Sequence, residues 1–356
     1  MRILIIGGTR FVGRHITEAA ISAGHEVSLL HRGRTGADLF PEAEHLVADR
    51  DGDLSLLRDR GWDVTIDVTA YAPSQVESLA SVLTTGQYVF VSTCAVYAAP
   101  KAPGYAEDAP LAETDGLTSE EVTPASYGPL KVLCERAAIE LFGPATLIVR
   151  PTYVIGPHDH TGRFTYWVNR IARGGEVLAP GDPSDPIQVI DGRDMAAWII
   201  SMAERAAAAR AAAGAATGTA PRTAAGEEGQ AAGTDPLDGT GVFHAVSPAP
   251  PFTFGDMLQA IADEVAPPGT TLTWVGEDFL LAEGENGRSL PLWSGGGDRG
   301  ALNTADPAAA NAAGLAPRPL ARSVREIRES EAGYATGNEI TPEREAELLA
   351  RWRSRS

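Results

Sequence analysis

A glycine-rich turn near the start of the chain constrains the fold more than any other feature of the sequence. The apolar run "RILII" at residues 2–6 is typical of a buried strand, and "GGTRFVG" at residues 7–13 follows it directly. From Phe11 to Ala23 apolar residues recur at helical spacing. A strand, a glycine turn and a helix in this order predict a site where backbone approaches a pyrophosphate and a helix N-terminus faces it. The contacts expected there are Gly7, Thr9, Arg10, Phe11 and Gly13.

Strand-like and helix-like segments alternate over residues 1–150. Five further strand-like runs follow the first, "EVSLL", "HLVA", "DVTID", "YVFVS" and "TLIVR". Helices are expected at about residues 73–83 and 127–142. Such alternation indicates βαβ units, and it predicts an α/β fold: a Rossmann-type, doubly wound parallel sheet that binds a dinucleotide.

Residues 151–356 have a looser, mixed pattern. We expect a smaller substrate-binding or lid region there, with returning elements that pack on the Rossmann core. Its clearest helix is "TFGDMLQAIADEV", where Thr253 caps the first turn and Asp256 stands three residues on. Residues 211–240 are rich in alanine and glycine and poor in large apolar side chains, which predicts a flexible insertion.

The composition limits the partners of the chain. It has 356 residues, 29 Lys and Arg against 47 Asp and Glu, and a net charge of −18, which repels nucleic acid and anionic membranes. Its two cysteines cannot form a disulfide framework, and no signal peptide or run of roughly 18 apolar residues is present. We therefore expect a cytoplasmic protein with a small-molecule substrate, without nucleic-acid or membrane partners, that can form a homodimer.

The end of the second strand favours NADP(H) over NAD(H). Sites for NAD usually place a carboxylate there, whereas this chain reads "LLHRGR" and has Arg32. Residues 1–34 hold five arginines and two glutamates, a basic start in an acidic chain. Because a guanidinium matches the geometry of a phosphate, Arg10 and Arg32 are predicted to bind the 2′-phosphate of NADP.

A hydroxyl, a phenol and an ammonium group are predicted to carry the chemistry. Thr93 follows a strand, while Tyr127 and Lys131 lie four residues apart at the start of a helix and share a face. A nearby ammonium lowers the pKa of a phenol, so Tyr127 can exchange a proton with an alcohol or carbonyl. Thr93 is predicted to orient the reacting oxygen.

Together these segments resemble the extended, atypical short-chain dehydrogenases/reductases of the NAD-dependent epimerase/dehydratase family. The matching stretches are "GGTRFVG", "STCAVY", "YGPLK", "RPTYVIGP" and "PIQVIDGRDMA". The resemblance implies that Thr93, Tyr127 and Lys131 are the catalytic Ser/Thr, Tyr and Lys, and that Lys131 also holds the nicotinamide ribose. It further implies that Asp49, with Arg50 beside it, contacts the adenine end of the cofactor.

The chain departs from the family at three positions. Arg10 replaces the middle glycine of the turn. Cys94 and Ala95 stand where sugar-nucleotide dehydratases carry Asp-Glu, and Tyr153 stands where sugar-nucleotide enzymes commonly have Asn. The residues expected to face the substrate are Cys94, Tyr153, His158 and Arg163, and no metal site is expected.

These features predict an NADP(H)-dependent reductase or dehydrogenase that acts on a carbonyl or alcohol of a small polar metabolite. One alternative is an NAD(P)-dependent epimerase of sugars or nucleotide sugars, which oxidises and re-reduces one carbon. A second alternative is a non-catalytic member of the same fold that binds a dinucleotide or RNA, since RNA-associated plastid proteins with "GGTRF" starts keep this fold.

Overall fold

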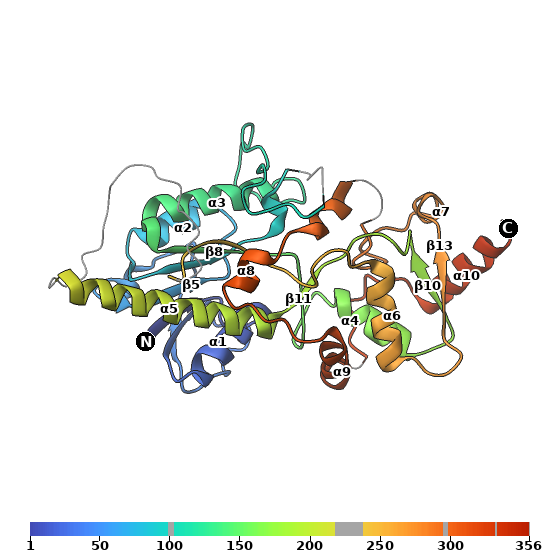
Figure 1. Cartoon of the computed structure of the whole chain (residues 1–356), viewed down its shortest axis with the longest axis horizontal. Coiled ribbons are helices and arrows are strands. Elements are labelled where there is room, and N and C mark those ends of the chain that lie inside the picture. The colour runs from blue at the N-terminus through green and yellow to red at the C-terminus, as the bar shows by residue number, and fades with distance from the viewer. Residues whose placement is uncertain (99–102, 218–237, 295–297, 332, 356) are drawn as a thin grey trace.

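The computed structural model describes residues 1–98, 103–217, 238–294, 298–331 and 333–355. Figure 1 shows two regions along the longest axis of the molecule. The larger region holds the N-terminus and a central sheet with helices above and below it. The smaller region holds the C-terminus and lies beyond one end of the sheet.

The central sheet has seven strands, all parallel, in the order β12-β8-β7-β5-β1-β2-β3. This confirms the predicted Rossmann-type α/β fold. The strands are β1 (Arg2–Ile6), β2 (Glu26–His31), β3 (Glu44–Val47), β5 (Val64–Asp67), β7 (Tyr88–Val91), β8 (Thr146–Pro151) and β12 (Gly241–Ala245). A separate short pair joins β4 (Gly61–Trp62) and β6 (Thr84–Thr85).

Both faces of the sheet are buried, which explains why its strands read as continuous apolar runs. In β1, Ile3 and Ile5 face one core, whereas Leu4 and Ile6 face the other. Helices α1 (Phe11–Ser22) and α5 (Gly192–Thr217) pack together on the first face. Helices α2 (Pro73–Ala80) and α3 (Tyr127–Phe142) cover the opposite face.

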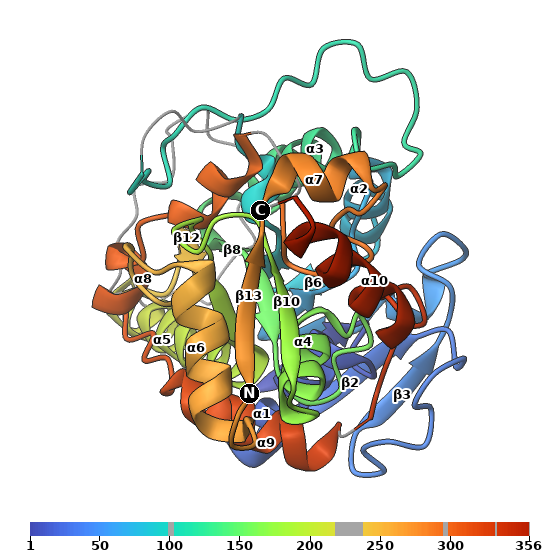
Figure 2. The ribbon, with the colours of Figure 1, turned by 90° about the vertical axis from the view of Figure 1, so that its right-hand side faces the viewer.

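The smaller region has a core of its own around the fully buried Trp167 and Phe254. Figure 2 looks onto this end, where β10 and β13 lie side by side and pair in parallel. A second parallel pair, β9 with β11, lies between the two regions. The elements are β9 (Tyr153–Ile155), α4 (Arg163–Ala172), β10 (Glu176–Pro180), β11 (Val189–Asp191), α6 (Phe254–Val265), β13 (Thr271–Val275), α7 (Glu277–Ala282), α9 (Leu320–Ser330) and α10 (Pro342–Arg353).

Most elements lie where the patterns predict them, with local differences. Helix α6 has the expected cap, since the Thr253 hydroxyl accepts from the amide of Asp256 at 3.0 Å. Helix α2 ends at Ala80 rather than near residue 83. Strand β12 is not predicted, yet it completes the sheet beside β8, and α8 (Ala308–Ala312) packs on it. Of the predicted insertion at 211–240, residues 211–217 extend α5, and 218–237 lie outside the described residues.

Candidate functional site

The glycine turn brings the start of α1 against β1 through close backbone contacts. Gly7 has a φ of +86°, and a Cβ placed there would lie 2.3 Å from Cγ2 of Thr69. A Cβ at Gly13 would lie 2.0 Å from the Gly7 carbonyl oxygen. The Thr17 hydroxyl fastens the turn by donating to the carbonyl of Gly8 at 2.9 Å. The backbone can therefore approach a ligand at Gly7, whereas Gly13 serves the packing of α1.

A cavity of about 730 Å³ opens beside this turn, across the carboxyl ends of the central strands. Its size is that of a site for a ligand of cofactor size. Ligands of open parallel sheets bind at this edge. The predicted site residues that line it are Gly7, Thr9, Arg10, Phe11, Arg32, Asp49, Arg50, Thr93, Tyr127, Lys131 and Arg163. Those that do not line it are Gly13, Cys94, Tyr153 and His158.

The predicted catalytic residues come together at one end, which we call the reacting end: Thr93, Tyr127 and Lys131. Thr93 follows β7, and its hydroxyl accepts from the amide of Ala95 at 3.1 Å. Tyr127 is the first residue of α3. The next residue must be glycine, because a Cβ at Gly128 would lie 2.2 Å from the carbonyl oxygen of Ala95. This close approach brings the first residue of α3 beside the segment after β7, and the Thr93 hydroxyl acts to lower the pKa of the Tyr127 phenol.

Lys131 is buried and held by backbone carbonyls. Its Nζ donates to the carbonyl oxygen of Ala70 at 3.0 Å and to that of Val91 at 2.9 Å. Burial lowers the pKa of Lys131 to about 8. The ammonium also lies over the rings of Phe90 and Tyr71, 4.1 and 5.4 Å from their centroids. Lys131 thus links the loop after β5 to the end of β7.

The phenol of Tyr127 differs from the expectation based on spacing alone. Burial raises the pKa of Tyr127 above its ordinary value, the neighbouring Tyr71 adds to the rise, and the hydrogen bond with Thr93 opposes it. We expected Lys131 to lower this pKa, but desolvation of the phenol is the largest cause and acts in the opposite direction. At neutral pH Tyr127 is therefore a protonated donor.

The opposite end of the cavity, which we call the basic end, carries exposed arginines. Arg10, Arg32 and Arg34 line it, and none forms an ion pair with any described residue. No carboxylate ends β2: its last residue, His31, bonds to His45 through Nε2 at 2.8 Å. Such unpaired guanidinium groups are free to bind an anionic ligand.

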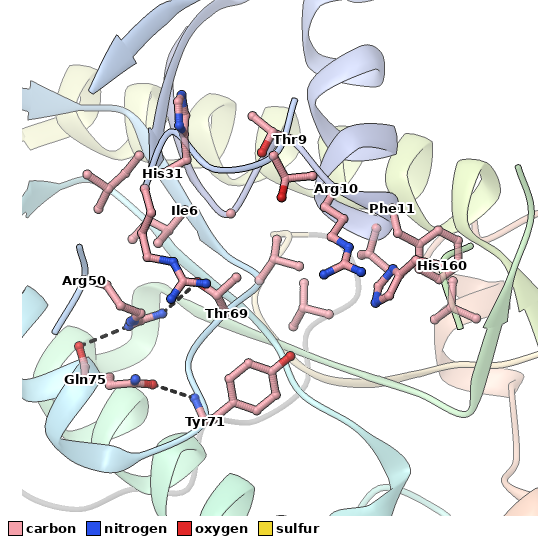
Figure 3. Close-up of a pocket in the computed structure, with 18 of the residues that line it drawn as sticks. Ile6, Thr9, Arg10, Phe11, His31, Arg50, Thr69, Tyr71, Gln75 and His160 are labelled. Carbon is pink, nitrogen blue, oxygen red and sulfur yellow. Dashed lines mark hydrogen bonds between the residues drawn. The ribbon is translucent and has the colours of Figure 1, made fainter. Parts of the chain in front are cut away.

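Arg50 lines the cavity, but its guanidinium serves the protein rather than a ligand. It donates to both carboxylate oxygens of the buried Asp67 at 2.8 and 3.0 Å, and to the backbone carbonyl of Gln75 at 3.2 Å. Figure 3 shows this link and a second one, in which the Gln75 side chain accepts from the amide of Tyr71. Arg50 therefore supports the loop after β5, and its contact with the adenine end of a cofactor stays a prediction. Asp49 stays exposed in the cavity.

On the side of the smaller region, Arg163 faces the cavity from the start of α4. Its guanidinium lies 4.9 Å from the ring centroid of Tyr153, and its Nε donates to the Thr161 hydroxyl at 3.1 Å. Tyr153 thus contacts the cavity only through Arg163. His160, which was not among the expected residues, also lines the cavity, and Figure 3 shows its ring beside the Arg10 guanidinium.

Besides Tyr153, two further expected substrate contacts, Cys94 and His158, do not line the cavity. Cys94 is buried and its Sγ donates to the carbonyl of Arg150 at 3.3 Å, while burial raises the pKa of its thiol to about 12. A neutral, enclosed thiol is a packing residue rather than a nucleophile. His158 turns away from the cavity, and its backbone amide donates to Glu331 at 2.9 Å.

Sequence reasoning missed several lining residues besides His160, and four of them are Thr69, Tyr71, Gln75 and Thr152. All four follow the carboxyl ends of strands β5 and β8, which is the signal that could have identified them. Among the described residues, no group of three or more His, Cys, Asp or Glu side chains could hold a metal ion. No described helix combines the length and apolar character needed to cross a membrane.

Comparisons with known proteins concern the family and the fold. Residues 62–213 match the model of the NAD dependent epimerase/dehydratase family, in agreement with the resemblance inferred from the sequence motifs. A curated relative, the chloroplast stem-loop binding protein of 41 kDa b of Arabidopsis thaliana, is 26% identical over 218 residues. That match covers 56% of this chain and 54% of the relative, so the chain spans about half the length of that relative.

Several solved structures share the fold. The UDP-glucuronic acid 4-epimerase of Bacillus cereus in complex with NAD is 15% identical, with a TM-score of 0.58, and the match covers 94% of this chain and 99% of that one. The UDP-glucose 4-epimerase of Thermotoga maritima, also 15% identical, has a TM-score of 0.60 and coverage of 93% and 98%. A human epimerase family protein with NADPH is 19% identical, with a TM-score of 0.59 and coverage of 92% and 99%. At these identities the likeness establishes the fold alone.

Proposed function

We propose that this member of the NAD dependent epimerase/dehydratase family is an NADP(H)-dependent oxidoreductase that interconverts a carbonyl and an alcohol of a small polar metabolite. One observation carries the proposal: a single cavity joins the reacting end, with Thr93, Tyr127 and Lys131, to the basic end, with Arg10 and Arg32. The first set suits proton transfer at an oxygen, and the second suits a phosphate.

The residues present fit a dinucleotide. At Gly7 there is no room for a Cβ, and the N-terminus of α1 follows this turn. At the basic end, arginine side chains without an ion-pair partner among the described residues line the cavity. When bound, the nicotinamide supplies or accepts the hydride. Lys131 would hold its ribose, and Arg10 and Arg32 would hold the 2′-phosphate that distinguishes NADP from NAD.

The raised pKa of Tyr127 keeps the phenol protonated, which is the state that carbonyl reduction requires of a proton donor. A protonated phenol donates its Oη proton to a carbonyl oxygen as that oxygen becomes an alcohol. The Thr93 hydroxyl lines the same cavity and would orient the same oxygen. Cys94 and Ala95 offer no acid or base for the elimination of water, which argues against a dehydratase.

An epimerase is the second candidate, and contacts between the two regions favour it. His15 on α1 forms a buried hydrogen bond through Nε2 to the carbonyl of Pro157 at 2.9 Å. The loop that carries Pro157 continues to His160, whose ring meets that of Phe11 edge-on at 6.1 Å. A loop fastened in this way beside the glycine turn would slow cofactor release, as an epimerase that keeps its dinucleotide requires.

A binding role without catalysis is the third candidate, because the Arabidopsis relative is named for stem-loop binding. The net charge of −18 argues against RNA as a ligand of this chain. Lys131 of the predicted catalytic set is also buried, whereas a nucleic acid would need an exposed basic surface.

The test starts from the natively purified protein. Mass spectrometry under native conditions identifies any retained dinucleotide, and assays with a panel of aldehydes, ketones and sugars follow. Oxidation of NADPH in step with carbonyl loss supports the reductase. Isomerisation without net change of the cofactor supports the epimerase instead, and specific RNA binding with no turnover supports the third candidate.

A further inference from the structure

Tyr71 is a second tyrosine at the reacting end that neither the motifs nor the proposed mechanism uses. It lies in the loop between β5 and α2 and lines the cavity. Its side chain is large and apolar, yet the residue is 42% exposed. Its hydroxyl makes no hydrogen bond to any described residue, and Figure 3 shows it pointing into the cavity opposite Arg10. Such a group faces whatever the cavity holds.

The backbone of Tyr71 is fixed from two sides. The Gln75 side-chain oxygen accepts from the amide of Tyr71 at 2.8 Å, and the Gln75 amide group donates to Asp51 at 2.7 Å. On the other side, the carbonyl of Ala70 accepts from the Nζ of Lys131. Tyr71 is therefore exposed although its loop is held in place by hydrogen bonds, one of which comes from Lys131.

The ring of Tyr71 lies close to both groups expected to meet the nicotinamide half of a dinucleotide. Its centroid is 6.4 Å from that of the Tyr127 ring and 5.4 Å from the Nζ of Lys131. A ribose held by Lys131 must therefore lie against Tyr71. The basic end, where the adenine half would lie, is formed instead by Arg32 and Arg34 after β2.

We propose that Tyr71 is a binding residue for the nicotinamide half of the dinucleotide, with its ring against the ribose that Lys131 holds and its hydroxyl donating to that half of the cofactor. The proposal rests on the proposed function in one respect only: the cavity must bind a dinucleotide. It does not depend on which carbonyl or sugar is turned over.

Truncation of the ligand tests this assignment. Full-length wild type, Tyr71→Ala and Tyr71→Phe are titrated calorimetrically with NADPH and with adenosine 2′,5′-bisphosphate, which lacks the nicotinamide half. We expect Tyr71→Ala to weaken NADPH roughly tenfold or more, through the lost ring contact and hydrogen bond, and to leave the bisphosphate within about twofold. Tyr71→Phe keeps the ring, so it should reduce the affinity for NADPH by an intermediate amount and leave the affinity for the bisphosphate unchanged. Arg32→Ala is the matched control at the other end and should weaken both ligands.

Each outcome decides the question. Unchanged NADPH affinity in Tyr71→Ala overturns the proposal, and so does an equal loss for both ligands in a variant with unchanged melting temperature. If Tyr71→Ala fails to fold, the same comparison is made with Tyr71→Phe. A loss of affinity for NADPH but not for the bisphosphate then supports the proposal. An NADPH affinity equal to that of wild type overturns it. If wild type binds neither ligand, the proposed function and the role of Tyr71 fail together. If wild type binds both but reduces no carbonyl, the proposed reaction fails while the selective loss still supports Tyr71.

Discussion

The two ends of the cavity satisfy their charges in opposite ways. At the reacting end Lys131 is enclosed, and backbone carbonyls of Ala70 and Val91 accept its protons. At the basic end Arg10 and Arg32 are exposed and have no carboxylate partner among the described residues. The protein therefore fixes the geometry of the reacting groups in advance, whereas it leaves the basic end to be completed by the ligand. Substitutions at the two ends should consequently fail in different ways.

The largest effect is expected from Tyr127→Phe, which removes only the phenolic oxygen from the reacting end. Turnover should fall by about 10²–10⁴, the usual contribution of a positioned general acid. The melting temperature and the NADPH affinity should stay unchanged, because the ring remains. Steady-state kinetics with the substrate found in the panel, together with a fluorescence titration of NADPH, check this. Full activity in the variant would mean that the proton comes from another group.

Lys131→Ala should damage the fold as well as the chemistry. It leaves the carbonyls of Ala70 and Val91 enclosed without a donor, at a cost of about 1–3 kcal/mol for each group that stays unpaired. Urea unfolding measures the loss. Arg136→Ala, an exposed change on the same helix, is the control and should alter the free energy of unfolding by about 0.5 kcal/mol at most. Equal stabilities of the two variants would contradict a structural role for Lys131.

At the basic end, Arg32→Ala should change selectivity and leave stability alone. The preference for NADP(H) over NAD(H) should narrow by about 1–3 kcal/mol, the scale of a charge-assisted hydrogen bond. Because the arginine is exposed, the effect should also shrink at high salt. Parallel titrations of NADPH and NADH provide the measurement. Arg58→Ala, which removes an exposed charge outside the cavity, should leave the preference as it is. A wild type that prefers NADH would refute the assignment of the basic end.

The smallest effect concerns pH. The pKa of Lys131 is about 8 in the folded chain against an ordinary 10.5, so between these values the unfolded chain binds more protons. Stability from this residue therefore rises as pH increases through 8. The free energy of unfolding of wild type, relative to that of Lys131→Met, should be greater at pH 9 than at pH 7 by about 1 kcal/mol. A difference that is constant with pH would show that the lysine titrates normally.

The two ends also differ in how far the sequence could predict them. Strand, glycine turn and helix at residues 2–22, and the Tyr127 helix, are local patterns, so their positions follow from spacing. The same patterns indicated that Thr93, Tyr127, Lys131, Arg10 and Arg32 would line one cavity, but they did not indicate Tyr71 or His160. The direction in which the pKa of Tyr127 shifts could not be predicted from the sequence, because it depends on how far distant segments bury the phenol.

Long-range pairings account for the remaining differences. Arg50 pairs with Asp67, which lies on a strand 17 residues away, and no local pattern distinguishes that pair from two free site residues. Strand β12 was missed because five residues give a weak signal by themselves. Only their register beside β8 identifies them as part of the sheet. Tyr71 could have been found by asking which side chains follow the carboxyl end of β5.

The position of β12 has a consequence for how the chain is made. Strand β8 is complete at residue 151, but its partner at residues 241–245 leaves the ribosome about 90 residues later. Until then the nascent sheet ends in an uncovered parallel edge, which offers unpaired backbone groups to other chains. At about 5–20 residues per second, that edge stays open for several seconds in each round of synthesis. The first elements of the smaller region, from β9 to β11, are made during that interval, so the sheet closes before α6 and the rest of that region are translated.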